Sequence, residues 1–312
     1  MSAVPTVAPD AGVAVAQDKP KVRRRSRGGP GAGGRPGVFP TLFMLAFLVY
    51  FLMPLGWLFI ASTKSLDDLF SSFGLWLSGF NLFDNISDTF SKDGGVYWTW
   101  LRNTLGYSLI SAVGAALLAA AAGYGFAKFA FRGKNLLFWF VLGSVMVPTT
   151  ALAIPTYLMF SKLGFTNNPL SVILPSLVSP FGIYLMRIYA EAAVPSDLME
   201  AARIDGAGEF HIFRKIAFRL LAPGFVTVLL FTFVATWNNY FLPLVMLSEP
   251  RWYPLTVGLQ QWNSQATAGG GATATFNTVI TGSLISIVPL ILAFIFLQRY
   301  WQSGLGTGGV KG

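Results

Sequence analysis

The sequence has no cysteine and only one histidine, His211, among its 312 residues. Disulfides, thiolate metal sites and cysteine nucleophiles are therefore excluded, and a single imidazole argues against a histidine metal site or a Ser-His-Asp triad. The GxxxxGK[ST] loop that binds nucleotide phosphates is also missing, as is the HExxH zinc spacing. We therefore expect no catalytic residue, no metal site and no bound cofactor in this chain.

Charged residues are scarce as well. They make up 11% of the chain, whereas soluble domains carry about 25%. Hydrophobic residues reach 54%, and the nine Trp and 28 Phe suit both the hydrocarbon and the headgroup levels of a bilayer. The composition therefore predicts a chain embedded in lipid.

Six long apolar stretches follow one another along the chain, and each can supply the roughly 20 residues that cross a bilayer. Because lipid offers no hydrogen bonds to the backbone, we expect these stretches to be helices in an all-α polytopic membrane protein. They cover about Pro40–Ser62, the run between Arg102 and Lys128, the run between Lys134 and Lys162, Leu170–Tyr189, Leu221–Leu247 and Phe276–Leu297.

Lysine and arginine are unevenly distributed between these stretches. Seventeen of the 22 lie in residues 1–37, after the second stretch, around the fourth and fifth stretches, and at the C-terminus. The other five are Lys64, Lys92, Arg102, Lys162 and Arg251. The positive-inside rule then places both termini in the cytoplasm and supports an even number of spans. This topology explains the net charge of +9 better than nucleic-acid binding does.

Residues 1–37 are rich in Ala, Pro and Gly and contain a basic run, Lys21–Arg27. Such a segment cannot bury a core, so we expect a disordered cytoplasmic tail before a membrane domain at 38–312. The basic run can attract the anionic lipids of the inner leaflet. It can also simply hold this end of the chain in the cytoplasm, which is the interpretation we favour.

The spans lack buried charge. No Asp, Glu, Lys or His lies deep within a stretch, and Arg187 lies at an edge. Ion-coupled transporters place ionisable groups there, so their absence argues against proton-coupled transport by this chain alone. Prolines recur inside the stretches, and the helix breaks they cause are tolerated where helices line a cavity; ordinary helix curvature is the alternative. These prolines are Pro54, Pro148, Pro155, Pro175, Pro180, Pro243 and Pro289.

Uncharged polar residues inside the stretches are candidates for contact with a neutral solute. Amides and hydroxyls match sugar hydroxyls, and an aromatic face can stack on a pyranose ring. Hydrogen bonding between helices and an interfacial aromatic belt are the structural alternatives. The candidate substrate-path residues are Trp237, Asn238, Asn239, Tyr240, Thr149 and Thr150, with Thr156 nearby.

The loop at 191–223, between the fourth and fifth stretches, is long and polar. Ser196 is expected to cap a short helix, with Asp197 in its first turn. Gly206 and Gly208 are expected to end that helix. A second helix should follow, with an apolar stripe on one face. The stripe consists of Phe210, Phe213, Ile216, Ala217, Leu220 and Leu221.

The same loop carries a motif, EAA-x(2)-DGA-x(5)-F-x(2)-I, followed by Pro223. It resembles the EAA loop of the permeases of binding-protein-dependent ABC importers, although Arg219 stands where that family often has proline. The resemblance implies a type I ABC importer permease fold with six spans and a loop that docks into a groove on an ATPase subunit. The residues that would carry this coupling are Glu200, Ala201, Ala202, Asp205, Gly206, Ala207, Phe213 and Ile216.

Three further segments resemble the maltose-type carbohydrate-uptake subfamily, and in particular its smaller, six-span permease. They are Trp237–Asn238 with Pro243–Leu244, Arg251–Leu259 and Gly304–Gly312. The resemblance implies a bacterial cytoplasmic membrane protein that pairs with a second permease, two ATP-binding subunits that hold ATP and Mg²⁺, and a solute-binding protein. The last external loop would reach the binding protein through Arg251, Trp252, Tyr253 and Gln260.

Three other functions remain open from the sequence. A secondary transporter acting alone would need an ion site or an inverted repeat, and no internal repeat is evident. A membrane receptor or assembly protein would use the 191–220 region as a docking platform. Within the importer class, a polyol or glycerol phosphate is an alternative to a sugar.

Overall fold

The structure is a computed structural model that describes residues 37–268 and 275–306, with side chains as far as residue 300. The predictions for the basic tail and for the last residues of the chain lie outside these ranges. The described helices are α1 Val38–Thr63, α2 Leu66–Ser71, α3 Leu82–Lys128, α4 Lys134–Val145, α5 Thr149–Lys162, α6 Leu170–Ser176, α7 Pro180–Ala193, α8 Ser196–Ile204, α9 Glu209–Ile212, a π-helical turn Phe213–Ala217, α10 Phe218–Trp237, α11 Phe241–Met246, a 3₁₀ turn Pro250–Trp252, α12 Leu255–Thr267 and α13 Thr275–Gly306.

The chain divides into two units after Tyr50. The first unit contributes the beginning of α1, where the rings of Phe43 and Phe47 lie one turn apart with centroids at 4.6 Å. The second unit, Phe51–Gly312, contains every other described element.

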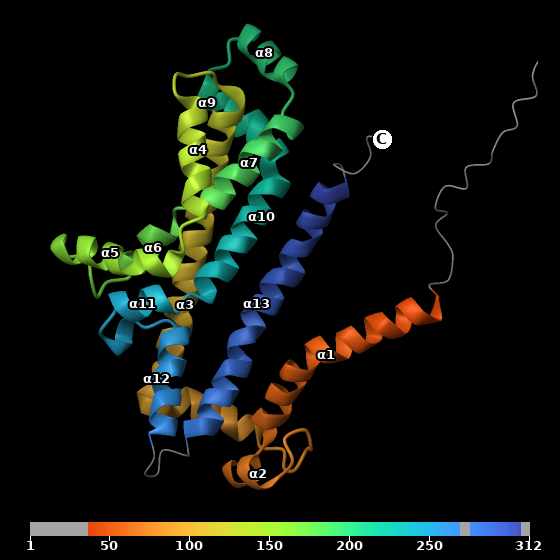
Figure 1. Ribbon diagram of the computed structural model, residues 1–312, viewed down its shortest axis with the longest axis vertical. Coiled ribbons are helices and arrows are strands. Elements are labelled where there is room, and N and C mark those ends of the chain that lie inside the picture. The colour runs from red at the N-terminus through yellow and green to blue at the C-terminus, as the bar shows by residue number, and fades with distance from the viewer. Residues whose placement is uncertain (1–36, 269–274, 307–312) are drawn as a thin grey trace, which may run out of the picture. The chain divides into compact units, whose positions relative to one another are not determined.

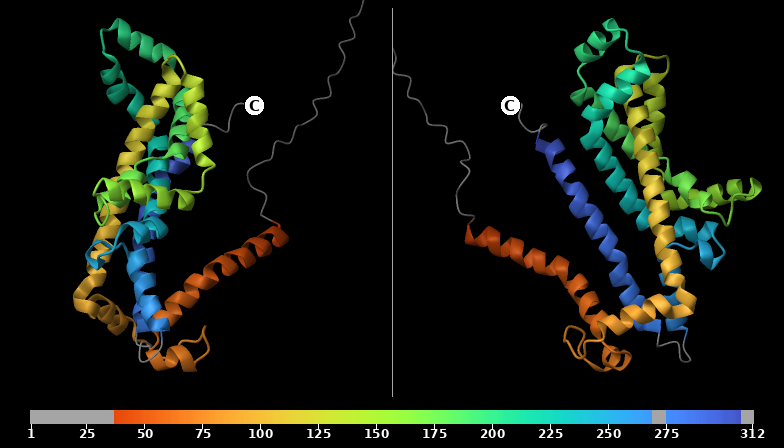
Figure 2. Two further views of the ribbon diagram at one scale, coloured as in Figure 1. Left: turned by 60° about the vertical axis from the view of Figure 1, so that its left-hand side comes forward. Right: turned by 180° about the vertical axis from the view of Figure 1, so that it is seen from behind.

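Helices α3, α7 and α10 form the centre of the second unit and run side by side (Figures 1 and 2). Small residues on α3 allow this close packing, because Ala112, Ala116 and Ala120 are all fully buried. The closest approach is at Gly123, where an added Cβ would lie 2.7 Å from the backbone nitrogen of Arg187 on α7. The contact between α3 and α7 therefore depends on the missing side chain at this position.

Helix α13 packs against both α3 and α10, and α12 packs against α13. Tyr97 and Trp100 at the beginning of the straight part of α3 meet Trp262 of α12, with the Trp100 and Trp262 ring centroids 4.8 Å apart. This aromatic cluster is fully buried and lies at the opposite end of α3 from the 191–223 loop (Figure 1).

The third and the fifth predicted spans are broken, and the fourth is interrupted at Leu177–Ser179 between α6 and α7. The third is a pair of helices, α4 and α5, bent by 104° between Val145 and Thr149. Pro148 separates them because it fixes its own backbone and restricts the residue before it. The predicted fifth span ends at Trp237 instead of Leu247, since Asn238–Tyr240 leave the helix before the short α11 begins.

Of four predictions about the local structure of the 191–223 loop, two are confirmed and two are wrong. A short helix with Asp197 in its first turn is confirmed, and Gly206 ends it with a φ of +81°. The cap was wrong, because Pro195 occupies the N-cap and Ser196 is already helical. The apolar stripe was also wrong at two members, since Phe210 is 74% exposed and Leu220 is 38% exposed.

The π-helical turn explains this second error. A π-turn adds one residue to a helical turn, so the buried positions become Ile212, Ala217 and Leu221. The spacing from Ile212 to Ala217 is five residues, which an α-helical pattern of three and four does not anticipate. Phe213 and Ile216 are half-buried beside this row.

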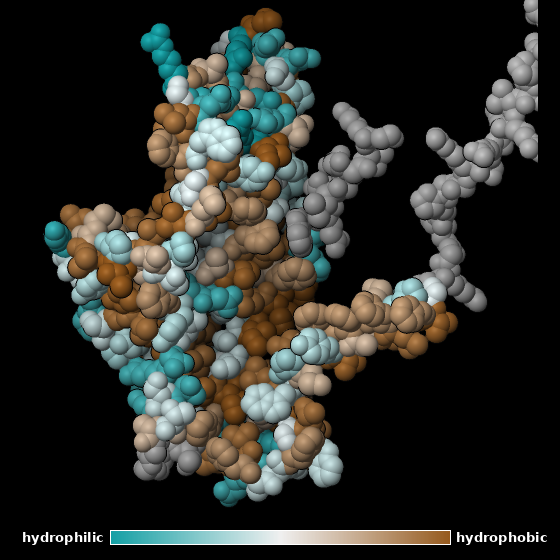
Figure 3. Space-filling view, viewed as in Figure 1, coloured by the Kyte–Doolittle hydropathy of each residue, from teal (hydrophilic) through white to brown (hydrophobic). Residues whose placement is uncertain are grey.

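By length and composition, five helices can cross a membrane, or six if the bent pair α4–α5 is one span. Hydrophobic residues cover the middle of the visible face, whereas hydrophilic residues gather at the end that carries α8 and α9 (Figure 3). The all-helical, membrane-spanning architecture expected from the composition is confirmed over the described residues.

Candidate functional site

The polar end of the molecule is formed by an elbow, which we define as α8, the turn at Asp205–Gly208 and α9. The left-handed Gly206 reverses the chain, and the amide of Ala207 then donates to the carbonyl of Ala202 at 2.9 Å. This hydrogen bond closes the C-terminal end of α8. The turn of the elbow is therefore defined by its backbone geometry.

The residues that the motif singles out divide into two groups in this elbow. Four of them are exposed: Glu200, Ala201, Asp205 and Gly206. The others face the protein, because Ala202 is buried and Ala207, Phe213 and Ile216 pack against the buried cluster around it. Two exposed apolar side chains accompany the first group, Ile204 at 87% and Phe210 at 74% exposed.

An ion pair crosses the elbow and was not anticipated from the sequence. Arg203 Nε donates to Glu209 Oε1 at 2.6 Å, and its Nη2 donates to Oε2 at 3.3 Å. The hydrogen bond from Arg203 lowers the pKa of the Glu209 carboxyl, and the same bond raises the pKa of Arg203. The pair joins the last turn of α8 to the first residue of α9 on the solvent side of the turn.

Tyr124 attaches the elbow to the bundle. It lies near the C-terminal end of α3, and its hydroxyl is 3.8 Å from the sulfur of Met199 on α8. Its ring centroid is 5.1 Å from that of Phe213 in the π-helical turn. Tyr124 is only 3% exposed, so this contact between α3 and the 191–223 loop is buried.

The predicted substrate-path residues lie at the two broken spans. Thr149 and Thr150 are exposed at the first turn of α5, and Asn238 and Tyr240 are exposed before α11, which packs against α5. The side chain of Asn238 donates to the carbonyl of Val234 at 2.9 Å, and the carbonyl of Asn239 accepts from Thr256 at 2.8 Å.

Trp237 differs from its neighbours. It is 3% exposed and packs against Phe233, with ring centroids 5.6 Å apart. Its ring faces are covered within this chain, so a solute that reaches Asn238 and Tyr240 does not meet Trp237 without a rearrangement.

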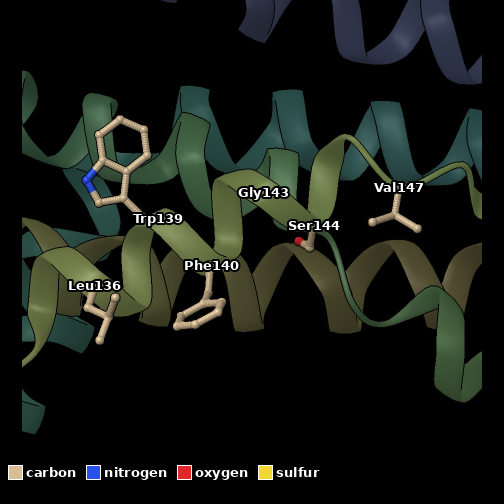
Figure 4. A pocket seen from close by; sticks show the side chains of 6 residues that line it. All are labelled: Leu136, Trp139, Phe140, Gly143, Ser144 and Val147. Atoms are coloured by element: carbon tan, nitrogen blue, oxygen red, sulfur yellow. The ribbon is translucent and has the colours of Figure 1, made fainter.

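A shallow groove of about 420 Å³ on α4 does not belong to this polar set. Its lining is apolar apart from Ser144, whose hydroxyl donates to the carbonyl of Val141 at 2.7 Å, and Leu136 and Phe140 point to the same side of the helix (Figure 4). Such a surface suits acyl chains or another apolar helix, and it offers a sugar almost no partners.

At the other end of the molecule, the segment Glu249–Leu255 connects α11 to α12. Arg251 is exposed, and its guanidinium lies 5.1 Å from the ring of the half-buried Trp252. The Tyr253 hydroxyl donates to the carbonyl of Ser248 at 3.1 Å, while Gln260 is exposed on α12. Three of the four predicted external residues are therefore adjacent on one segment, and Gln260 lies on the following helix.

Asn167 fixes one end of this segment. It has a φ of +53°, which is uncommon for a residue other than glycine. Its Oδ1 accepts from the backbone amides of Ser248 and Glu249, both at 3.1 Å. Its backbone amide donates to the carbonyl of Met246 at 2.8 Å. The loop between α5 and α6 therefore lies at the same end of the molecule as the segment after α10.

Comparison with known proteins decides which family this arrangement represents. Residues 112–304, more than half of the chain, match the model of the binding-protein-dependent transport system inner membrane component. The chain belongs to this family of ABC importer permeases. The match includes the elbow, both broken spans and the external segment, and the resemblance of the EAA motif to the permeases of binding-protein-dependent ABC importers is thereby confirmed at the level of the family.

Two curated relatives of the permease are both described as arabinooligosaccharides transport system permease proteins. An arabinooligosaccharides transport system permease protein of Halalkalibacterium halodurans is 36% identical over 73% of this chain and 79% of its own length. Its counterpart from Bacillus subtilis is 33% identical over 87% of this chain and 95% of its own length. Among solved structures, a bacterial ABC transporter involved in the import of the acidic polysaccharide alginate superposes with a TM-score of 0.75. That chain is 22% identical, covering 85% of the permease and 96% of the alginate protein, so the likeness concerns the fold.

Proposed function

We propose that this permease forms half of the translocation pathway of an ATP-driven importer for a neutral oligosaccharide. The observation that carries the proposal is the elbow, a rigid and exposed element that projects from the end of the bundle and is built on the family's motif. It is suited to fit a groove on an ATPase subunit, because Ile204 and Phe210 offer apolar anchors beside the carboxylates of Glu200 and Asp205. ATP and Mg²⁺ would be held by that partner and not by this chain.

The broken third span supports a polar pathway. Helix α4 has 12 residues, which corresponds to about 18 Å at 1.5 Å per residue. This is well short of the roughly 30 Å hydrocarbon core, so the break at Val145–Thr149 falls within the membrane. Exposed irregular backbone at such a depth is tolerated only where it lines a water-filled cavity or meets other protein. Thr149 and Thr150 would then face the pathway and hydrogen-bond sugar hydroxyls.

The substrate class is inferred from two sources. The curated relatives described above are named for arabinooligosaccharides, and the exposed polar groups at both breaks are hydroxyls and amides without charge. A neutral oligosaccharide satisfies both. A phosphorylated solute would be expected to require Lys or Arg at these breaks.

The assembly proposed for transport contains a second permease, two ATP-binding subunits and an external solute-binding protein. Both termini would lie on the cytoplasmic side of the bacterial cytoplasmic membrane, together with the elbow. The binding protein would dock on the opposite side, at the segment with Arg251, Trp252 and Tyr253 and at Gln260 on α12.

Transport by the reconstituted assembly tests this function. Proteoliposomes containing both permeases and the ATPase subunits should accumulate an arabinooligosaccharide only when ATP and the binding protein are both supplied. Uptake by this chain alone, without ATP, would instead identify a secondary transporter. A Glu200→Lys variant should assemble in the membrane and lose uptake, because it reverses a charge at the docking surface.

A further inference from the structure

The beginning of α3 holds the external segment by its backbone. Four side chains at positions i, i+3, i+4 and i+7 lie on one face of the helix, and each one hydrogen-bonds to the main chain about 150 residues further on. These four residues, which we call the α3 clamp, are Trp100, Asn103, Thr104 and Tyr107.

The clamp uses four consecutive carbonyl groups. Trp100 Nε1 donates to the carbonyl of Pro250 at 2.9 Å. Asn103 Nδ2 donates to the carbonyls of Arg251 and Tyr253 at 2.8 and 3.1 Å. The Tyr107 hydroxyl donates to the carbonyl of Trp252 at 2.9 Å.

Thr104 completes the clamp by accepting a hydrogen bond from the segment, whereas the other three side chains donate. Its Oγ1 accepts from the amide of Leu255 at 2.7 Å and donates to the carbonyl of Trp100 at 2.9 Å. All four clamp side chains are at most 8% exposed. Buried hydrogen bonds of this kind are costly to break, because the carbonyl or amide left behind has no water to replace its partner.

The clamp bonds to the backbone of the segment and leaves the side chain of Arg251 exposed. Arg251 keeps 67% of its side chain exposed, and its guanidinium is paired with Glu249, whose other oxygen accepts from Asn167. The exposed chemistry of the segment is thus presented from a main chain fixed at every residue from Pro250 to Tyr253.

The helix that contains the clamp, α3, also contacts the elbow. Trp100 and Tyr124 are 24 residues apart on α3, which corresponds to about 36 Å of continuous helix. Tyr124 contacts Met199 and Phe213 of the 191–223 loop. The only non-helical residues inside α3 are Lys92–Gly95, before the clamp begins.

We propose that the α3 clamp is a set of positioning residues for the reception of the binding protein. It fixes the external segment to α3, so that the surface that receives the binding protein moves as one body with the helix that contacts the 191–223 loop through Tyr124. The inference rests on the proposed function. It goes beyond the family match, which begins at residue 112, after all four clamp residues.

The test uses the assembled transporter, with its ATPase rate measured as a function of binding-protein concentration. Thr104→Val keeps the shape of the side chain and removes the hydroxyl, whereas Thr104→Ser keeps the hydroxyl. Asn103→Asp replaces a donor to two carbonyls with an acceptor. We expect Thr104→Val and Asn103→Asp to raise the half-saturating concentration at least about fivefold, with a maximal rate near wild type. Thr104→Ser should restore the wild-type curve.

Thr89→Val is the matched control, because Thr89 is a buried threonine of α3 whose hydroxyl bonds only within the helix, to Asn85 at 2.7 Å. A shift in Thr89→Val as large as that in Thr104→Val would overturn the proposal, and so would a wild-type curve for Asn103→Asp. If Asn103→Asp fails to assemble, Tyr107→Phe decides by the same criterion. Absence of any stimulation in the wild-type assembly would refute the proposed function instead of the clamp.

Discussion

At the scale of single residues, Arg203 and Glu209 form an ion pair that links the two helices of the elbow. Both side chains are exposed, so their attraction is weakened by water and salt. Their geometry nevertheless gives two parallel hydrogen bonds between the planar groups, which restrains direction as well as distance. The restraint acts across Gly206, where the backbone itself is permissive.

A charge reversal at Glu209 tests this restraint. Glu209→Arg places two guanidinium groups across the turn, and we expect a several-fold loss of ATP-driven uptake because the elbow opens. The double variant Arg203→Glu with Glu209→Arg should recover most of the uptake. Glu191→Gln serves as the control, since it breaks the Arg187–Glu191 ion pair on α7 instead. Equal loss in the single and double variants would contradict the restraint.

The pH dependence of this ion pair follows from the direction of the pKa shifts. The pKa of Glu209 is lowered in the folded protein, so the contribution of the pair is complete above the ordinary glutamate pKa near 4.5 and is lost as the pH falls below it. Coupling measured between pH 6 and 8 should therefore not change through Glu209. High salt should weaken it at any of these pH values.

Gly123 provides a prediction about stability. An alanine there would place its Cβ 2.6 Å from the Cβ of Met186 on α7, and overpacking of this kind typically costs about 1–3 kcal/mol. Gly125→Ala is the matched control, because no atom lies within 4 Å of its Cβ and alanine favours the helix by up to about 1 kcal/mol. Thermal unfolding in detergent should show a lower midpoint for Gly123→Ala only. Equal midpoints would mean that α3 and α7 separate easily.

At the scale of elements, hydropathy located the helices but not their continuity. The run Lys134–Lys162 is apolar throughout, so its composition gives no sign of a 104° bend. Pro148 was a visible signal, because the residue before a proline is disfavoured in a helix. Pro243 lies inside α11, after the break at Asn238–Tyr240, and Pro223 lies inside the unbroken α10. A single sequence does not show which proline breaks a span, since neighbouring helices decide whether the freed backbone groups find partners.

The functional elements were predicted unevenly for the same reason. The sequence placed the short helix α8 and the turn at Gly206 correctly, because these are local signals, although the N-cap is Pro195 and not Ser196. The π-helical turn and the α3 clamp depend on distant packing partners. Trp100, Asn103, Thr104 and Tyr107 do show a helical spacing in the sequence, but their partners lie about 150 residues away and are main-chain groups that no side-chain pattern reveals.

The bend between α4 and α5 yields a prediction about the pathway. Replacing both Thr149 and Thr150 with valine removes two exposed hydroxyls while keeping the shape of the helix. If each hydroxyl bonds a sugar, the substrate concentration for half-maximal uptake should rise roughly twofold to tenfold per hydroxyl. Thr156→Val on the same helix is the control, since its hydroxyl bonds the carbonyl of Leu152. Unchanged uptake kinetics in the double variant would remove these threonines from the pathway.

At the scale of the whole molecule, the contacts determine which helix ends lie together. Tyr124 brings the end of α3 to the elbow, whereas Asn167 and the clamp bring the α5–α6 loop and the start of α3 to the segment after α10. Over the described residues, the number of possible spans rises from five to six if the bent pair α4–α5 counts as one crossing. The even number of spans that the Lys/Arg distribution predicts favours six.

Accessibility labelling tests that topology, and the absence of native cysteine makes the measurement direct. Ser264→Cys lies exposed on α12, and Ser196→Cys lies exposed at the start of α8. We expect a membrane-impermeant maleimide to label Ser264→Cys in intact spheroplasts, and to label Ser196→Cys only after permeabilisation. Labelling of both from the same side would refute the proposed orientation.

The bond between Asn167 and Ser248 also has a consequence for biosynthesis. The two residues are 81 positions apart, so at about 5–20 residues per second Ser248 is synthesised roughly 4–16 s after Asn167. During that interval α5 lacks the packing partner α11, and the loop after it lacks the bond to Ser248. The 191–223 loop is synthesised before either of these partners. The nascent permease therefore completes the elbow before the bond between Asn167 and Ser248 can form, and Ser248 is synthesised only when about four-fifths of the chain has been translated.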